Sequence, residues 1–165
     1  MVKYADGPTA EVSVMVAAPP AEVWTHAADI NVPARFSREF QGATWLTEGP
    51  TVGATFEGRN NREGREWSVT CTITDYSPER VFEWIVGAAM ATKVARWRFD
   101  LEPVDTGTRL TFSAEMGPAP SGLTPIIEQM PDREEDIVAR RLDEWTQNMT
   151  ATVEGIKGLA EAGAA

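Results

Sequence analysis

The amino-acid sequence predicts an α+β fold: a curled, seven-stranded antiparallel sheet with two short helices after its first strand and one long C-terminal helix over the concave face. Two observations lead to this prediction. Between residues 40 and 116, short segments of alternating apolar and polar residues are separated by turn residues. After residue 131, one long stretch has its apolar residues at helical spacing.

The N-terminal part predicts one strand followed by two short helices. In the segment 11–16 the valines alternate with other residues, so they share one face of a strand. A pair of prolines then ends the strand and suits the first turn of a helix over 20–28, in which Val23 and Trp24 form the buried side. A second, brief helix is expected over 31–37.

Six further strands with short turns between them predict an antiparallel meander. In one of them, apolar residues alternate with serine and threonines, which is typical of a strand with one buried and one solvated face. The strands are expected over 44–47, 54–60, 65–76, 81–86, 94–102 and 110–116.

The long helix is expected over 132–160, with Asp132 and Glu135 as a capping box at its start. Its apolar stripe consists of Val138, Leu142, Trp145, Met149, Val153, Ile156 and Ala160. A segment rich in proline and glycine, 117–131, precedes it and contains a short helix over 124–130. This segment is either a mobile lid over a cavity or an ordinary packed connector.

Composition and charge limit the possible functions. The 165 residues suit a single domain, 1–165, with a core of about 10–161. A formal net charge of -10 and the lack of a basic cluster argue against a nucleic-acid partner. No apolar stretch is long enough for membrane insertion, and residues 1–10 lack the pattern of a secretory signal. With a single cysteine, an intrachain disulfide is impossible, and we expect a cytoplasmic protein.

One long helix cannot cover the whole concave face of seven strands, because a helix with its side chains is only ~10–12 Å across. The rest of that face must be filled by bulky side chains, a partner or a ligand. Small residues such as Gly58 and Ala95 beside aromatic ones favour an apolar cavity, although the aromatic side chains alone could fill the space. We expect Trp97 and Trp145 to face each other across it. The residues expected to line the cavity are Trp67, Cys71, Phe82, Trp84, Trp97, Leu142, Trp145 and Met149.

Three polar residues are candidates for catalysis. Asn60 shares a strand face with the cavity residues, so its amide could bind a ligand carbonyl or, equally well, cap the next turn. Arg59 and Arg65 could reach over the rim and stabilise an enolate, or they could be solvated charges at strand ends.

The other reactive groups favour structural interpretations. His26 has no carboxylate partner in the sequence pattern and is expected on a helix surface, and Cys71 is expected to be a buried, inert thiol. Glu115 and Asp143 are interpreted as surface charges. One histidine and one cysteine do not form a metal-binding motif, and no phosphate-binding motif is present, so we expect no metal and no cofactor.

Several short motifs occur along the chain in a fixed order, namely Pro19-Pro20-Ala21-Glu22-Val23-Trp24, Val52-Gly53-Ala54-Thr55-Phe56, Pro78-Glu79-Arg80-Val81-Phe82-Glu83-Trp84 and Trp97-Arg98-Phe99-Asp100-Leu101-Glu102-Pro103. Their order and spacing resemble those of the START-like or polyketide cyclase/dehydrase-like (SRPBCC) superfamily. The resemblance spans about residues 11–161 and implies the helix-grip fold. It also implies a hydrophobic or polycyclic small molecule as the binding partner.

That superfamily includes aromatase/cyclases, lipid carriers, hormone receptors and proteins that sequester a natural product. The resemblance therefore implies either cyclisation or dehydration of a polyketide, without metal or nucleotide, or a non-catalytic carrier. Cyclases of this group place a polar set that includes histidine in the pocket. Here the one histidine, His26, lies in the first predicted helix, which departs from that pattern. A regulator that uses the fold to bind a partner, without a ligand, is a third alternative.

Overall fold

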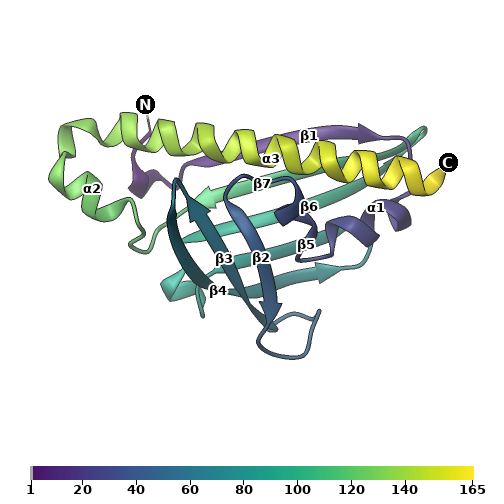
Figure 1. Ribbon diagram of the computed structural model, residues 1–165, viewed down its shortest axis with the longest axis horizontal. Coiled ribbons are helices and arrows are strands. Elements are labelled where there is room, and N and C mark those ends of the chain that lie inside the picture. The colour runs from purple at the N-terminus through teal and green to yellow at the C-terminus, as the bar shows by residue number, and fades with distance from the viewer. Residues whose placement is uncertain (1) are drawn as a thin grey trace.

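Seven antiparallel strands form one curled sheet in the computed structural model of the protein, which describes residues 2–165 (Figure 1). Along the sheet their order is β1-β7-β6-β5-β4-β3-β2, so consecutive strands from β2 to β7 are neighbours, as the predicted meander requires. The strands are β1 (Thr9–Val16), β2 (Phe40–Trp45), β3 (Thr55–Arg62), β4 (Arg65–Ser77), β5 (Val81–Val86), β6 (Ala95–Val104) and β7 (Gly107–Met116).

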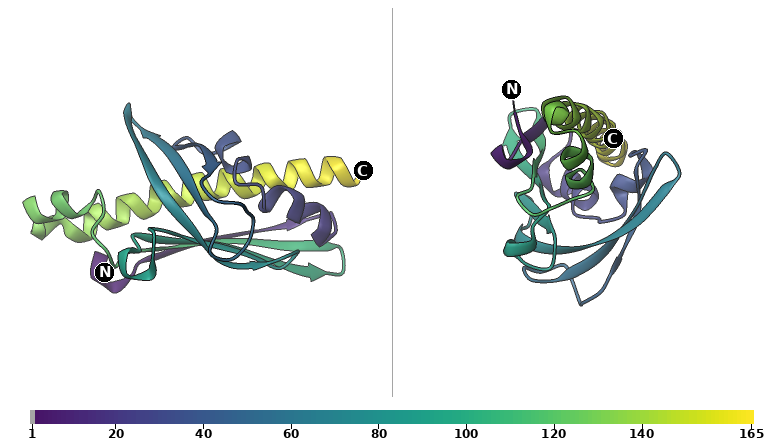
Figure 2. Two further views of the ribbon diagram at one scale, coloured as in Figure 1. Left: turned by 90° about the horizontal axis from the view of Figure 1, so that it is seen from below. Right: turned by 90° about the vertical axis from the view of Figure 1, so that its left-hand side faces the viewer.

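The helices lie on the concave side of this sheet. Figure 2 shows α3 crossing above one part of the sheet while the β3–β4 hairpin curls upward beside it. The helices are α1 (Pro20–Ala27), α2 (Thr124–Gln129) and α3 (Glu134–Ala164), with 3-10 turns η1 (Tyr4–Asp6), η2 (Val32–Arg35), η3 (Met90–Thr92) and η4 (Pro131–Arg133). None of the helices within residues 2–165 is long and apolar enough to cross a membrane. The curled sheet with the long helix α3 on its concave side is the predicted helix-grip arrangement.

The start of α3 differs from the sequence prediction. Pro131 begins a 3-10 turn, in which the backbone N–H of Arg133 donates to the carbonyl of Met130 at 2.9 Å. Asp132 therefore lies inside a turn, and Arg133 occupies the N-cap position without a hydrogen bond from its side chain that caps the helix. The predicted capping box is wrong for this reason, and the helix begins two residues later than expected.

The inward-facing residues alternate along the strands as predicted. Most of the buried apolar side chains on the concave face of the sheet come from strands β3 to β7. A bulge between Ile73 and Asp75 interrupts the alternation near the end of β4. Buried members include Phe56, Cys71, Ile73, Phe82, Ala95, Phe99, Leu101, Leu110, Phe112, Ala114 and Met116.

The two halves of α3 have different surroundings. From Met149 to Ala160 the helix packs on the core, where Val153, Ile156 and Ala160 are completely buried. In its first two turns and a half, Val138 is the one fully buried residue. The core thus fills the space under the C-terminal half of α3 and leaves room under the N-terminal half.

Candidate functional site

An internal cavity of about 510 Å³ lies between the sheet and the N-terminal half of α3. Its walls come from β3 to β7, the segment after η2, the start of α2 and α3. Seven of the eight residues expected to line it do so, namely Trp67, Cys71, Phe82, Trp84, Trp97, Trp145 and Met149. Leu142 does not line it. The lining stripe of α3 runs through Arg141, Trp145, Asn148 and Thr152, whereas Leu142 is turned ~100° from Arg141 and packs against the core.

Aromatic side chains form much of the apolar wall. Trp97 and Trp145 face each other with ring centroids 4.7 Å apart, which confirms the predicted contact between strand and helix. Phe99 and Phe112 stack at 4.0 Å deeper in the sheet. These rings occupy part of the concave face, and the space beside them remains open, next to the small residues Gly58 and Ala95.

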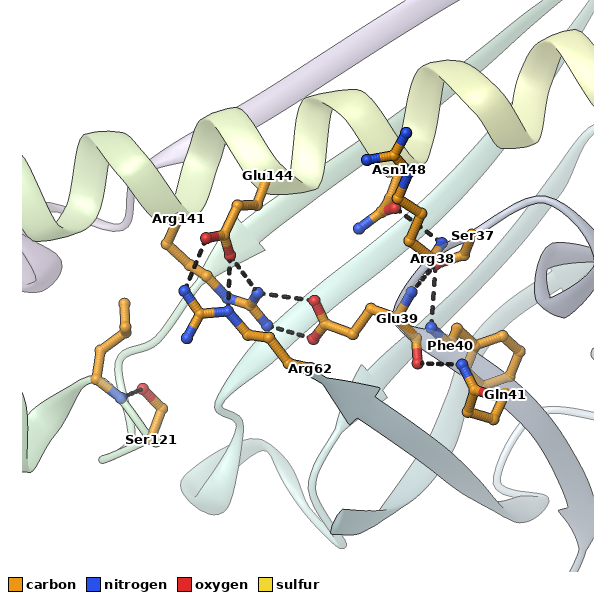
Figure 3. Close-up of polar contacts among 11 residues, drawn as sticks. Ser37, Arg38, Glu39, Phe40, Gln41, Arg62, Ser121, Arg141, Glu144 and Asn148 are labelled. Carbon is orange, nitrogen blue, oxygen red and sulfur yellow. Dashed lines mark hydrogen bonds and ion pairs between the residues drawn. The ribbon is translucent and has the colours of Figure 1, made fainter. Parts of the chain in front are cut away.

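A cluster of four charged residues closes one side of the cavity and joins three parts of the chain that are distant in sequence (Figure 3). Arg141 of α3 donates two parallel hydrogen bonds to the carboxylate of Glu39, which precedes β2, and a third, of 2.8 Å, to Glu144. Arg62, at the end of β3, donates to both oxygens of Glu144 at 2.9 and 2.7 Å. Such bidentate pairs fix geometry as well as charge.

The pKa values of Arg141 and Glu144 indicate that both side chains stay ionised. Burial lowers the pKa of Arg141, but hydrogen bonds and charge from Glu39 and Glu144 outweigh it and raise that pKa above its ordinary value. Burial raises the pKa of Glu144, yet Arg62 and Arg141 together hold it below the ordinary glutamate value. Neither Arg141 nor Glu144 is therefore ready to give or take a proton near neutrality.

The three candidate catalytic residues are divided between the two faces of the sheet. Asn60 and Arg65 line the cavity near the charged cluster. Arg59 points to the opposite face, because neighbouring residues of a strand alternate, and donates to Thr44 Oγ1 at 2.9 Å. Of the two interpretations given for Arg59, the catalytic one at the cavity rim is therefore wrong, and the solvated charge agrees with its exposed position.

Three further titratable residues, Cys71, His26 and Glu115, offer no catalytic arrangement at the cavity. Burial raises the pKa of Cys71 to about 12, so its thiol is protonated and a poor nucleophile at neutral pH. His26 lies on α1, 3.6 Å from Glu22, and does not line the cavity. Glu115, interpreted as a surface charge, pairs with the buried side chain of Lys93.

Sequence reasoning missed Arg141 and Glu39. A signal for Arg141 was present: it lies four residues before Trp145, so it had to share the helix face that lines the cavity. Nothing comparable identifies Glu39, because it lies in an irregular segment whose path depends on tertiary packing.

The fold and the cavity together define a helix-grip protein with an internal apolar pocket. Comparisons with known proteins are consistent with this. A family model described as "Polyketide cyclase / dehydrase and lipid transport" matches residues 8–158. The chain therefore belongs to this family. No curated protein sequence matches it at a significant level.

Solved structures with the same fold include proteins from several bacteria. A polyketide_cyc-like protein from Corynebacterium glutamicum, Cgl2372, is 31% identical, with 94% of this chain and 92% of that chain covered and a TM-score of 0.64. The Zhui aromatase/cyclase from a Streptomyces species is 20% identical, with 93% of each chain covered and a TM-score of 0.69. TTHA0849 from Thermus thermophilus is 11% identical, with 96% and 100% covered and a TM-score of 0.67. At 20% and 11% identity, the last two show a common fold only.

Proposed function

We propose that the protein binds a hydrophobic or polycyclic small molecule in the cavity under α3 and carries or sequesters it unchanged. The observation that supports this most directly is the cavity itself, about 510 Å³ and walled by indole and phenyl rings. Pockets for small organic ligands commonly have volumes of roughly 300–1,000 Å³ and mostly apolar walls. A planar apolar molecule fits this size and this lining.

The state of Glu39 and Cys71 favours binding over chemistry. A general acid or base works best with a pKa near the working pH and a free position beside the substrate. Among the lining residues, both oxygens of Glu39 are engaged by Arg141, and the thiol of Cys71 is protonated. Binding by shape and apolar contact needs none of these groups.

A polyketide cyclase or dehydrase is the second candidate function. It is favoured by Asn60 and Arg65, two hydrogen-bond donors that line the cavity and that could stabilise a developing enolate. The resemblance to an aromatase/cyclase in fold is consistent with it.

Binding can be tested with a variant that fills the cavity. Val69 is half-buried and lines the cavity, whereas its neighbour Ser68 is exposed on the other face of β4. Wild type should bind the neutral dye N-phenyl-1-naphthylamine, with quenching of tryptophan emission by energy transfer. Val69→Trp should abolish this binding, and Ser68→Trp should leave it unchanged. Native mass spectrometry of the purified protein should also detect a co-purified apolar compound.

Two outcomes would contradict the proposal. If wild type does not bind the dye, or if Val69→Trp binds it as well as Ser68→Trp does, the cavity is not the binding site. If a bound poly-β-ketone compound is released as a cyclised isomer or with loss of water, the cyclase or dehydrase function is the correct one.

A further inference from the structure

Two arginines face each other at the polar end of the cavity. Arg62 ends β3 and Arg65 begins β4, with the turn Glu63-Gly64 between them, and the two arginines are cross-strand partners in the sheet register. Both line the cavity. Like charges directly opposite each other destabilise a sheet, so an anion close to both would relieve the repulsion.

The protein supplies an anion to only one of the two. Arg62 is paired with Glu144 on both carboxylate oxygens. Arg65 has no carboxylate within ion-pair distance in the part of the chain from residue 2 to residue 165. The acidic residues adjacent in sequence do not serve it: Glu63 is exposed in the turn, and Glu66 lies on the other strand face, beside Asn61.

The charge of the surrounding cluster is positive as well. Arg62, Arg140 and Arg141 share the two carboxylates of Glu39 and Glu144, and Arg65 adds a further positive charge. This excess occurs in a chain whose formal net charge is -10. Arg65 is thus the arginine of this group whose charge no carboxylate of residues 2–165 offsets within ion-pair distance, so it can pair with an anion in the cavity.

A donor and an apolar surface adjoin Arg65. Asn60 and Trp67 are cross-strand partners next to the arginine pair, and both line the cavity. The side-chain amide of Asn60 has no hydrogen-bond partner among residues 2–165. An oxygen held by Arg65 can thus accept from Asn60 as well, while the carbon skeleton attached to it lies against the indole of Trp67.

We propose that the ligand of this cavity is an amphiphile whose anionic group, in the simplest case a carboxylate, sits between Arg62 and Arg65 while its apolar body lies among the tryptophans. This inference rests on the proposed binding function and adds the chemical class of the ligand. An anion at this position completes the ion pairing of Arg65 and offsets the repulsion within the arginine pair.

Two probes with the same carbon skeleton test the inference. N-phenyl-1-naphthylamine is neutral, and 1-anilinonaphthalene-8-sulfonate adds one anionic group, which stands in for the carboxylate. Arg65→Gln should weaken binding of the anionic probe by about fivefold or more and should change binding of the neutral probe little. Arg65→Lys should retain part of the affinity for the anionic probe. Arg80→Gln, in the exposed β4–β5 turn, is the matched control and should affect neither probe.

The salt dependence provides an independent readout. Affinity for the anionic probe should fall as ionic strength rises, and Arg65→Gln should reduce this dependence. The inference is overturned if Arg65→Gln weakens both probes equally, or if it leaves the anionic probe unaffected. If wild type binds neither probe, the proposed binding function fails, and this inference fails with it.

Discussion

At the scale of single residues, Arg141 has the most unusual position in the molecule. It is an arginine on the cavity side of α3, its side chain is 13% exposed, and it contacts two carboxylates, Glu144 of the same helix and Glu39 of the segment before β2. Its guanidinium also lies 6.0 Å from the ring centre of Trp145, which in turn faces Trp97. Arg141 thus connects the charged cluster to the aromatic wall of the cavity.

Removing this charge should destabilise the protein. Arg141→Gln leaves the carboxylate of Glu39, whose side chain is 15% exposed, without its bidentate partner. Breaking one side of such a pair commonly costs about 3–5 kcal/mol when it is fully buried, and we expect roughly 2–4 kcal/mol here because some water reaches it. Arg140→Gln is the control. That arginine is 72% exposed and should change the free energy of unfolding by less than about 0.5 kcal/mol.

Urea denaturation followed by tryptophan fluorescence measures both variants. Equal midpoints for Arg141→Gln and wild type would show that the cluster contributes nothing to stability. A double variant, Glu39→Gln with Arg141→Gln, should recover part of the loss, because it removes the unpaired charge as well.

At the scale of elements, the sequence allowed the strands and their faces to be predicted better than the site. Trp67, Trp97 and Phe112 lie on the predicted face because alternation within a strand is a local property. The contact between Glu39 and Arg141 joins residues 102 positions apart and depends on the curl of the whole sheet. No pattern within one element indicates such a contact. Within a helix the prediction was also incomplete. Leu142 was expected to line the cavity, because the spacing of apolar residues did not distinguish the side of α3 that faces the cavity from the side that faces the core.

Phe36 packs closely against the backbone of helix α3 at Gly155, a contact that the sequence pattern of the helix does not predict. A Cβ atom added at Gly155 would lie 2.4 Å from ring atoms of Phe36, which follows η2. The absence of a side chain lets that aromatic ring lie against the helix backbone. The segment leading into β2 and Glu39 is thereby held next to α3.

The contact between Gly155 and Phe36 can be tested by comparing two glycines of α3, Gly155 and Gly158. Alanine normally stabilises an exposed helix position relative to glycine by about 0.5–1 kcal/mol, and Gly158→Ala should do so because no atom lies within 4 Å of the added methyl group. Gly155→Ala should instead destabilise the protein by about 1–2 kcal/mol, since overpacking against the ring of Phe36 exceeds the gain in helix propensity. Thermal unfolding should give melting temperatures shifted in opposite directions. An upward shift for Gly155→Ala would mean that Phe36 can move aside at little cost.

At the scale of the whole molecule, the cavity is enclosed by elements of unequal packing. The sheet and the C-terminal half of α3 carry the buried core. The connection between β7 and α3 has no fully buried residue in α2, and Met130 at its end is 46% exposed. Four residues of this connection, Ser121, Gly122, Leu123 and Ile126, nevertheless line the cavity. A weakly packed segment that forms part of a cavity wall is well placed to admit a ligand.

Hydrogen exchange distinguishes a lid from a fixed connector. If α2 is a lid, backbone amides over 123–130 should exchange quickly in the free protein, because few buried contacts hold them, and should become protected when N-phenyl-1-naphthylamine fills the cavity. The paired strands β1 and β7 serve as the internal control and should exchange slowly in both states. Leu123→Ser should weaken dye binding if the lid contributes an apolar wall. Equal protection of 123–130 with and without the dye would identify the segment as a permanent connector.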